Sequence, residues 1–220
     1  MSNLIEFQNN EDLAFFGKVN ASISHELKNI LAIISEAAGL LNDLTEMATK
    51  GQNFELEMMK TCSQDIVEEI QRGFTTIKRM NVFSHSMDNP LKRVNLIEVL
   101  DLIINLAGFL SFASKVHFDP PVGAAPIVLT CSWRLQNLIY QTLVFAFESV
   151  GPDGEIEVSL HPQKNGSARV TVSGLGSKSA RKFPLDKTIQ IAESISAEIG
   201  VTDDSQAYDI LVPQFIEGMR

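Results

Sequence analysis

Residues 21–44 read ASISHELKNILAIISEAAGLLNDL, and their spacing decides how the first part of the chain folds. This stretch contains no proline and a single glycine, Gly39. Its apolar residues recur at alternating steps of four and three, at Ile23, Leu27, Ile30, Ile34, Ala37, Leu41 and Leu44. Such spacing is typical of helices that pack lengthwise against one another through a seam. We therefore expect one long helix with one buried face.

This helix is expected to form half of a hairpin. It should run from about Glu11 to Lys50, turn at KGQN (50–53), and be followed by a second proline-free helix that ends near Asp88. The second helix carries apolar residues at helical spacing, at Met59, Ile66, Ile70, Ile77 and Met80. Two helices of roughly 35 residues would each be about 50 Å long, too long to bury their stripes within one hairpin. A second copy of the chain is the simplest partner, which predicts a homodimeric four-helix bundle.

After residue 88 the long helical pattern ends, and shorter helix-like and strand-like segments follow. MDNPLKRVN, at 87–95, holds the first proline of the chain and is typical of a linker. Three helices are then expected, at 95–113, 132–150 and 185–200, the last of them closed by Gly200. Five strands are expected, at 115–119, 126–131, 155–160, 168–174 and 207–215. This order favours helices on one face of a sheet, an α/β sandwich, and the whole chain is of the α+β class.

The composition excludes several classes of function. The chain has 220 residues, 45% of them hydrophobic, and a formal net charge of −9, which argues against nucleic acid or an anionic membrane as the main partner. Acids stand where a signal peptide needs bases, and Glu98 and Asp101 interrupt the most apolar window, so no membrane span is expected. Cys62 and Cys131 lack metal-ligand spacing, which favours free thiols in the cytoplasm.

His25 is the side chain of this helix that is best suited to take part in a chemical reaction. At 100° per residue it stands about 200° from Ile23 and from Leu27, on the side of the helix opposite the seam. We therefore expect its ring to face solvent. Most exposed histidines have no function, and a surface role is the first alternative. The second is a nucleophilic imidazole that accepts and passes on a phosphoryl group, a task that needs an exposed ring on a rigid element.

The neighbours of His25 bear on this choice. Ala21 and Ser22, one turn earlier, are small and would let a bulky partner approach, while Lys28 and Asn29 share the face one turn later. The hairpin should also bring a basic band, Arg72, Lys78 and Arg79, within about two turns of His25. A zinc-protease motif would need a second histidine at position 29, and no oxyanion-hole loop accompanies Ser22 or Ser24.

At these residues the sequence resembles a known family. FFGKVNASISHELKNILAII, at 15–34, resembles the H-box of the dimerisation and histidine-phosphotransfer domain of sensor histidine kinases, and 77–107 resembles the end of that domain and the entry to the catalytic domain. The resemblance implies that His25 accepts the phosphoryl group, that Glu26 assists proton transfer, and that Asn29 positions a water for dephosphorylation. Ile30 replaces a common proline, so the usual helix bend is expected to be absent.

The second half departs from the family at its nucleotide site. RLQNLIYQTLVFAFESVGPDGEIEV, at 134–158, resembles the N-box helix, but Phe145 stands in the place of the magnesium-binding asparagine and Gln141 in that of an earlier asparagine. Ser173 or Gly174 stands where an aspartate would bind adenine, and no glycine-rich box precedes the last helix. The resemblance therefore implies a degenerate ATPase-like sandwich with no bound nucleotide or metal.

Taken together, these features resemble the dimeric histidine phosphotransferases built on a kinase-like scaffold, of the ChpT kind. The expected domains are a phosphotransfer hairpin at 1–88 and a degenerate catalytic-like sandwich at 89–220. The resemblance implies an enzyme without autokinase activity that relays phosphate between receiver domains of response regulators, with Mg²⁺ only in the receiver. Two alternatives remain open: a divergent kinase that still binds ATP, and a non-catalytic dimeric scaffold for a receiver.

Overall fold

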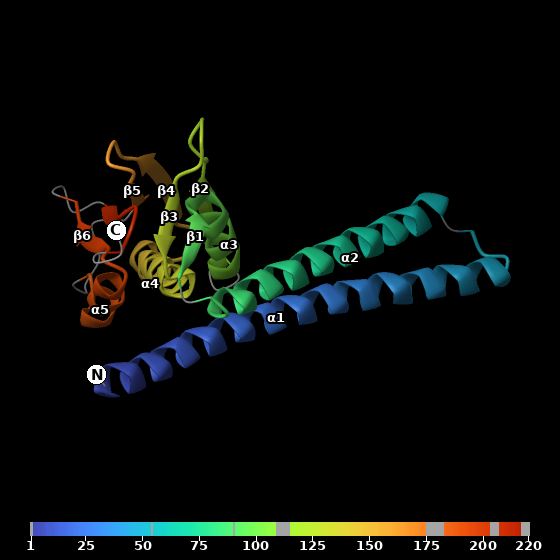
Figure 1. Ribbon diagram of the computed structural model, residues 1–220. Coiled ribbons are helices and arrows are strands. Elements are labelled where there is room, and N and C mark those ends of the chain that lie inside the picture. The colour runs from blue at the N-terminus through green and yellow to red at the C-terminus, as the bar shows by residue number, and fades with distance from the viewer. Residues whose placement is uncertain are drawn as a thin grey trace. The chain divides into compact units, whose positions relative to one another are not determined.

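The chain is an α+β protein that consists of a helical hairpin and an α/β sandwich (Figure 1). The computed structural model describes residues 2–53, 55–89, 91–108, 115–174, 183–202 and 207–216, with side chains from residue 11 onward. Its contacts define two units, Gly17–Val82 and the combination of Met1–Phe16 with Phe83–Arg220. The expected domain limits, 1–88 and 89–220, stay a prediction; by contacts, residues up to Phe16 and from Phe83 onward group with the sandwich.

The helical unit contains the expected hairpin. Helix α1 spans Ser2–Thr49 without interruption at Ile30, and α2 spans Leu56–Ser84, extended by a short 3-10 turn, η1, at His85–Met87. Gly51 makes the turn with a φ of 70°, a value that favours glycine. All seven seam residues of α1 are buried or half-buried. The predicted long helix with one buried face is therefore confirmed, although α1 begins earlier than Glu11.

Helix α2 turns small residues toward α1. Cys62, Gly73 and Thr76 are buried, and a Cβ added at Gly73 would lie 3.6 Å from Cγ2 of Ile30. Ile70 and Ile77, part of the expected apolar stripe, are instead each 41% exposed. The hairpin alone thus leaves apolar side chains of α2 in contact with solvent.

The sandwich is built on a five-stranded sheet. Its strand order is β2-β4-β5-β7-β6, antiparallel except for the parallel pair β2 and β4. These strands span Lys115–Phe118 (β2), Glu155–Pro162 (β4), Ala168–Ser173 (β5), Glu198–Val201 (β6) and Ala207–Val212 (β7). A separate antiparallel pair joins β1, Lys92–Asn95, to β3, Ile127–Thr130. The expected hairpin of β4 and β5 is confirmed.

Helices cover one face of this sheet (Figure 1). They span Leu96–Gly108 (α3), Ser132–Val150 (α4) and Asp186–Ser194 (α5). Along β4, Ile156, Val158 and Leu160 are buried while Glu155 and Glu157 are exposed, which is the alternation of a strand with one covered face. The predicted sandwich with helices on one side is confirmed.

Two expectations about single elements were wrong. The last helix does not run to Gly200: α5 ends at Ser194, and Gly200 lies in β6, paired with Asp209 of β7. Ser196, with a φ of 56°, makes the left-handed turn between them. Nor is 87–95 wholly a linker, since its second half forms β1. In both places pairing with a distant strand outweighs the local pattern.

An aromatic cluster ties the start of α1 into the sandwich unit. The ring of Phe15 lies 5.3 Å from Phe83, 4.9 Å from Trp133 and 5.1 Å from Tyr140, measured between centroids. The indole Nε1 of Trp133 donates to Oδ1 of Asp12 at 2.8 Å, so this buried ring has its polar atom satisfied. Trp133, in the first turn of α4, is 4% exposed and is part of this packed cluster.

Candidate functional site

His25 is exposed on α1, on the side away from the seam. Ile23 and Ile30 of the same helix are 1% and 2% exposed, so the helical-wheel prediction for the histidine is confirmed. Asn29 lies one turn later, with Nδ2 of its amide 3.3 Å from Nδ1 of the His25 ring. The amide therefore covers one of the two ring nitrogens. Because α1 is continuous through both residues, this pair sits on a rigid element.

Glu26 is held from the second helix. Its Oε1 accepts from Nε and Nη2 of Arg72, both at 2.9 Å, and Nη1 of Arg72 donates to Oε1 of Glu69 at 2.7 Å. The two carboxylates are largely shielded, with side chains 15% and 14% exposed, while Arg72 is 42% exposed. One guanidinium thus bridges two acids and joins α1 to α2 next to the histidine.

Glu69 lies on the inner side of the hairpin. Its Oε2 is buried and has no hydrogen-bond partner among the described residues. It faces α1 because its helical position falls between Ile66 and Gly73 on the inner side of α2. A carboxylate on the inner side of a hairpin needs a cation, and Arg72 supplies one.

Of the three residues expected to face a partner, two are exposed and one is buried. Ala21 and Lys28 are exposed beside His25. Ser22 is only 6% exposed, and its Oγ has no hydrogen-bond partner among the described residues, so the expectation of a solvent-facing Ser22 was wrong. The buried face of α1 is wider here than a two-position seam, since Val19, one turn earlier, is also fully buried.

In the sandwich, Phe145, the residue that the sequence resemblance aligns with a magnesium-binding asparagine, is a packed ring. Phe145 is 6% exposed, and its centroid lies 4.7 Å from that of Phe183 and 5.8 Å from that of Tyr208. Phe183 and Tyr208 are themselves 4.3 Å apart. Gln141, one turn before Phe145, donates from Nε2 to Oδ1 of Asn137 on the same helix at 3.2 Å. Three aromatic rings provide no ligand for a hydrated cation.

Ser173 and Gly174, which the resemblance aligns with an adenine-binding aspartate, have structural roles in the sheet. The hydroxyl of Ser173 donates to the backbone carbonyl of Glu157 at 3.3 Å. Gly174 has a φ of 90°, and a Cβ there would collide with the carbonyl oxygen of Glu155. This glycine is therefore required by the close packing of two backbones. Leu175 and Gly176 lie outside the described residues.

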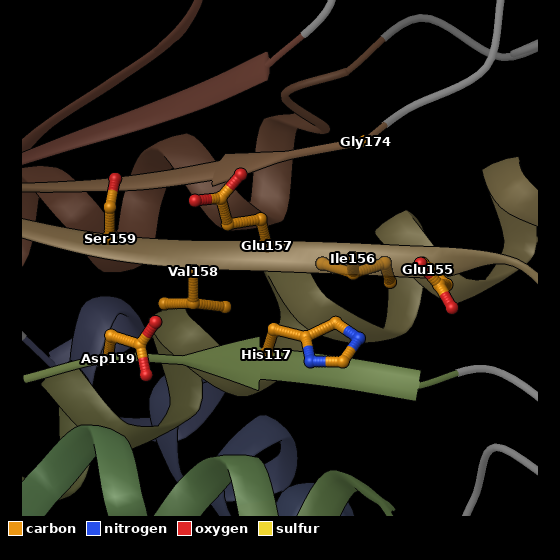
Figure 2. Close-up of a pocket in the computed structure, with 8 residues that line it drawn as sticks. All are labelled: His117, Asp119, Glu155, Ile156, Glu157, Val158, Ser159 and Gly174. Carbon is orange, nitrogen blue, oxygen red and sulfur yellow. The ribbon is translucent and has the colours of Figure 1, made fainter.

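A cavity of about 320 Å³ lies on the uncovered side of β2 and β4. Figure 2 shows His117, Asp119, Glu155 and Glu157 among its lining side chains. In the part of the chain that the structure describes, no three His, Cys, Asp or Glu residues are arranged to hold a metal ion. His117 and His161 are exposed, as expected of surface histidines, and Cys62 and Cys131 are free thiols.

Arg72 is the residue of the site that sequence reasoning left without a specific role. It was placed only in a basic band near His25, together with Lys78 and Arg79. Its partner could be found only from the register of the hairpin, which the contact between Gly73 and Ile30 fixes. Nothing in the local sequence distinguishes Arg72 from the other two bases.

Comparison with known proteins gives matches only among solved structures. No family model matches the sequence, and no curated protein does. The mycobacterial sensor histidine kinase MprB matches at 15% identity and a TM-score of 0.47, over 57% of this chain and 98% of that chain. The Acinetobacter baumannii histidine kinase AdeS matches at 10% identity and a TM-score of 0.46, over 86% of this chain and 98% of that chain.

A third match is the histidine kinase ThkA, solved in complex with the response regulator TrrA, at 18% identity and a TM-score of 0.44, over 99% of this chain and 67% of that chain. At this level of similarity, the function must be inferred from the residues of this chain and not from the matched proteins. Separately, none of its helices, within the described ranges, combines the length and apolarity needed to cross a bilayer.

Proposed function

We propose that the chain is a histidine phosphotransferase that relays phosphoryl groups between receiver aspartates through a phosphohistidine at His25. One observation carries this proposal: an exposed histidine, flanked by Asn29 and an anchored Glu26, occurs in a chain whose magnesium-asparagine position holds the buried ring of Phe145. The first feature suits a phosphoryl acceptor, and the second opposes ATP as the donor. A phosphorylated receiver is the donor that satisfies both.

The proposed transfer needs few groups from this chain. Nε2 of His25 attacks the phosphorus of an aspartyl phosphate, an N–P bond forms, and the P–O bond to the aspartate breaks. The aspartate leaves as a carboxylate, and the proton on Nδ1 of His25 passes to solvent. Mg²⁺ bound in the receiver would neutralise charge on the phosphoryl oxygens, so this chain need not supply a cation for that purpose. The reverse reaction returns the phosphoryl group to the aspartate of a second receiver.

The packing around Phe145 supports a relay over a kinase. A nucleotide would have to displace the stacked rings of Phe145, Phe183 and Tyr208 and would find no magnesium ligand there. In calorimetric titrations with Mg-ATP we expect no saturable binding below about 1 mM, because phosphate charge would remain uncompensated. Binding in the micromolar range would instead favour the divergent kinase.

Exposed apolar residues of the hairpin support a homodimer. On α2, Val67, Ile70, Phe74 and Ile77 are 55%, 41%, 65% and 41% exposed and recur at steps of three and four. On α1, Ile33 and Leu40 are 38% and 41% exposed and lie two turns apart. Such stripes are the pattern by which a second hairpin would complete a four-helix bundle. This dimer is part of the proposal.

Residues around His25 would contact the receiver. Ala21 leaves room on one side of the ring, and Lys28 places an exposed ammonium on the other. Lys28→Glu should weaken receiver docking while leaving His25 in place, because it puts an anion one turn from an anionic phosphoryl group. We expect this variant to take up phosphate more slowly at low receiver concentration and to recover the native rate at high receiver concentration.

The direct test uses receiver domains labelled with radioactive acetyl phosphate. Each labelled receiver is mixed with the native chain, and the two proteins are separated. We expect label on the chain within seconds to minutes for at least one receiver, and its passage to a second, unlabelled receiver. A chain that binds a receiver tightly and takes up no label would support the non-catalytic scaffold instead.

A further inference from the structure

The contact between Asn29 and His25 concerns the nitrogen that does not react. Nδ2 of Asn29 lies 3.3 Å from Nδ1 of the ring, one helical turn away on the exposed side of α1. In a neutral imidazole one nitrogen carries the proton and the other accepts, so a group that contacts Nδ1 also determines the state of Nε2.

The two halves of a phosphoryl relay make opposite demands on Nδ1. To attack phosphorus, Nε2 must have its lone pair, so the proton of the neutral ring must be on Nδ1. Once the N–P bond has formed at Nε2 and that proton has left, Nδ1 holds a lone pair and becomes an acceptor. The first state needs an acceptor beside Nδ1, and the second needs a donor.

A carboxamide can meet both demands from one position. Its Oδ1 accepts from Nδ1–H, and after a half-turn about the last side-chain bond its Nδ2 donates to the lone pair of Nδ1. In this structure Nδ2 lies toward Nδ1, which fits a ring with a lone pair on Nδ1, whereas the Nδ1–H ring that attacks phosphorus needs the amide turned by half a turn, with Oδ1 toward Nδ1. Glu26, the other polar neighbour, has its Oε1 shared between two nitrogens of Arg72.

We propose that Asn29 is a positioning residue for phosphoryl transfer itself, because its amide sets the protonation of Nδ1 in both the free and the phosphorylated ring. This inference rests on the proposed function and deepens it. It differs from the role that the family resemblance gives Asn29, the placement of a water for dephosphorylation. That role alone predicts that Asn29 variants spare transfer and retain phosphate longer.

Two substitutions separate the donor and acceptor roles. Asn29→Asp keeps an acceptor of nearly the same shape and removes the donor, whereas Asn29→Leu keeps the size and removes both. Asn42→Asp is the matched control, because Asn42 is also exposed on α1 and lies about 20 Å further along the helix. It adds the same charge to the same element.

The first measurement is made on the unphosphorylated chain. Long-range proton–nitrogen NMR at about pH 9, where imidazoles are neutral, distinguishes the two tautomers of each histidine. We expect Asn29→Asp to raise the ratio of Nδ1–H to Nε2–H at His25 by about tenfold, the size of one charge-assisted hydrogen bond. Asn29→Leu should lower this ratio, and Asn42→Asp should leave it at the native value.

The second measurement follows the label. With Asn29→Asp we expect uptake from a phosphorylated receiver at the native rate or faster. We also expect faster loss of phosphate from the isolated phosphohistidine, because the carboxylate favours the protonated, labile ring. With Asn29→Leu uptake should slow by about two- to tenfold, the range of one neutral hydrogen bond. Opposite effects of one substitution on uptake and retention would not arise from a purely structural role.

The outcomes separate this inference from the proposed function. Unchanged tautomers in both Asn29 variants, or equal uptake in Asn29→Leu and native chains, would overturn the positioning role while leaving His25 as the acceptor. No uptake by the native chain from any receiver would overturn the proposed function. In that case the tautomer measurement still reports whether Asn29 controls the ring.

Discussion

His25 illustrates how the surroundings of a side chain determine its chemistry. His25 and His161 are both exposed histidines. His161 lies on the uncovered face of the sheet with its Nε2 3.1 Å from the hydroxyl of Ser159. His25 stands on a continuous helix, with an amide at Nδ1 and an acid beside it that is fixed by Arg72. The hydroxyl beside His161 contacts Nε2, whereas the amide beside His25 contacts Nδ1, so a different nitrogen is covered in each ring.

Tyr140 of α4 should respond to substitution and to pH. Its side chain is 1% exposed, its Oη has no hydrogen-bond partner among the described residues, and burial raises its pKa from 10.0 to about 12. Tyr140→Phe removes a buried hydroxyl without a partner, so we expect the free energy of unfolding to rise by about 1 kcal/mol at neutral pH. Urea denaturation measures this difference.

The difference in unfolding free energy between Tyr140→Phe and the native chain should grow above pH 10. Because the folded-state pKa of Tyr140 lies above the unfolded value, its proton stabilises the fold below pH 10 and this contribution is lost as the pH rises toward 12. The native chain should therefore lose up to about 1.4 kcal/mol per pH unit in that window relative to Tyr140→Phe. A constant gap between the two proteins from neutral pH to pH 11 would contradict the assigned burial.

A substitution at Phe145 tests whether an asparagine at this position is enough to allow ATP binding. Phe145→Asn replaces a ring packed on Phe183 and Tyr208 with a short polar side chain. We expect unfolding free energy to fall by about 3 kcal/mol, as for other large-to-small changes in a core. No ATP binding should appear in calorimetry, because Ser173 and Gly174 still offer no carboxylate. Phe147→Asn, on the half-buried side of α4, is the control for the polar change itself.

Among the helices and strands, those that local pattern determines could be predicted from the sequence. The seam of α1, the turn at Gly51 and the limits of α4 all follow from residues close to one another along the chain. The end of α5 could not be predicted, because Gly200 reads as a helix cap and only pairing with Asp209 makes it part of a strand.

The features of the candidate site also divide into those that a local pattern predicts and those that depend on distant residues. The exposure of His25 and its contact with Asn29 follow from the period of one helix. The burial of Ser22 and the pairing of Glu26 with Arg72 depend on how two helices pack, information that no short stretch contains. The ring that packs on Phe145 lies 38 residues further along the chain in Phe183, beyond the reach of a local pattern.

Two glycines predict opposite effects of adding a methyl group. Gly73 is buried in α2, and an added Cβ would make an ordinary contact, 3.6 Å from Ile30. Gly73→Ala should therefore stabilise the chain by about 0.5–1 kcal/mol through helix propensity. Gly174→Ala should destabilise it by more than about 1 kcal/mol, because its φ of 90° and the carbonyl of Glu155 both exclude a side chain. Thermal unfolding of the two variants beside the native chain decides both signs.

At the scale of the whole chain, the exposed apolar stripe of α2 predicts a dimer that a single introduced charge would break. We expect the native chain to have the mass of a dimer in light scattering at micromolar concentration. Phe74→Glu should shift it toward monomer, because Phe74 is 65% exposed in the single chain and would carry a charge into the bundle. Val122→Glu, at a fully exposed position of the sandwich, is the control. A native chain that stays monomeric would contradict the four-helix bundle.

The most direct test of the relay is the transfer of label to His25→Ala. Because His25 is exposed and off the seam, the substitution should change the free energy of unfolding by no more than about 0.5 kcal/mol. His161→Ala removes another exposed histidine and serves as the control. We predict that a labelled receiver phosphorylates the native and His161→Ala chains and leaves a folded His25→Ala chain without label. Labelling of His25→Ala at the native rate would contradict the account.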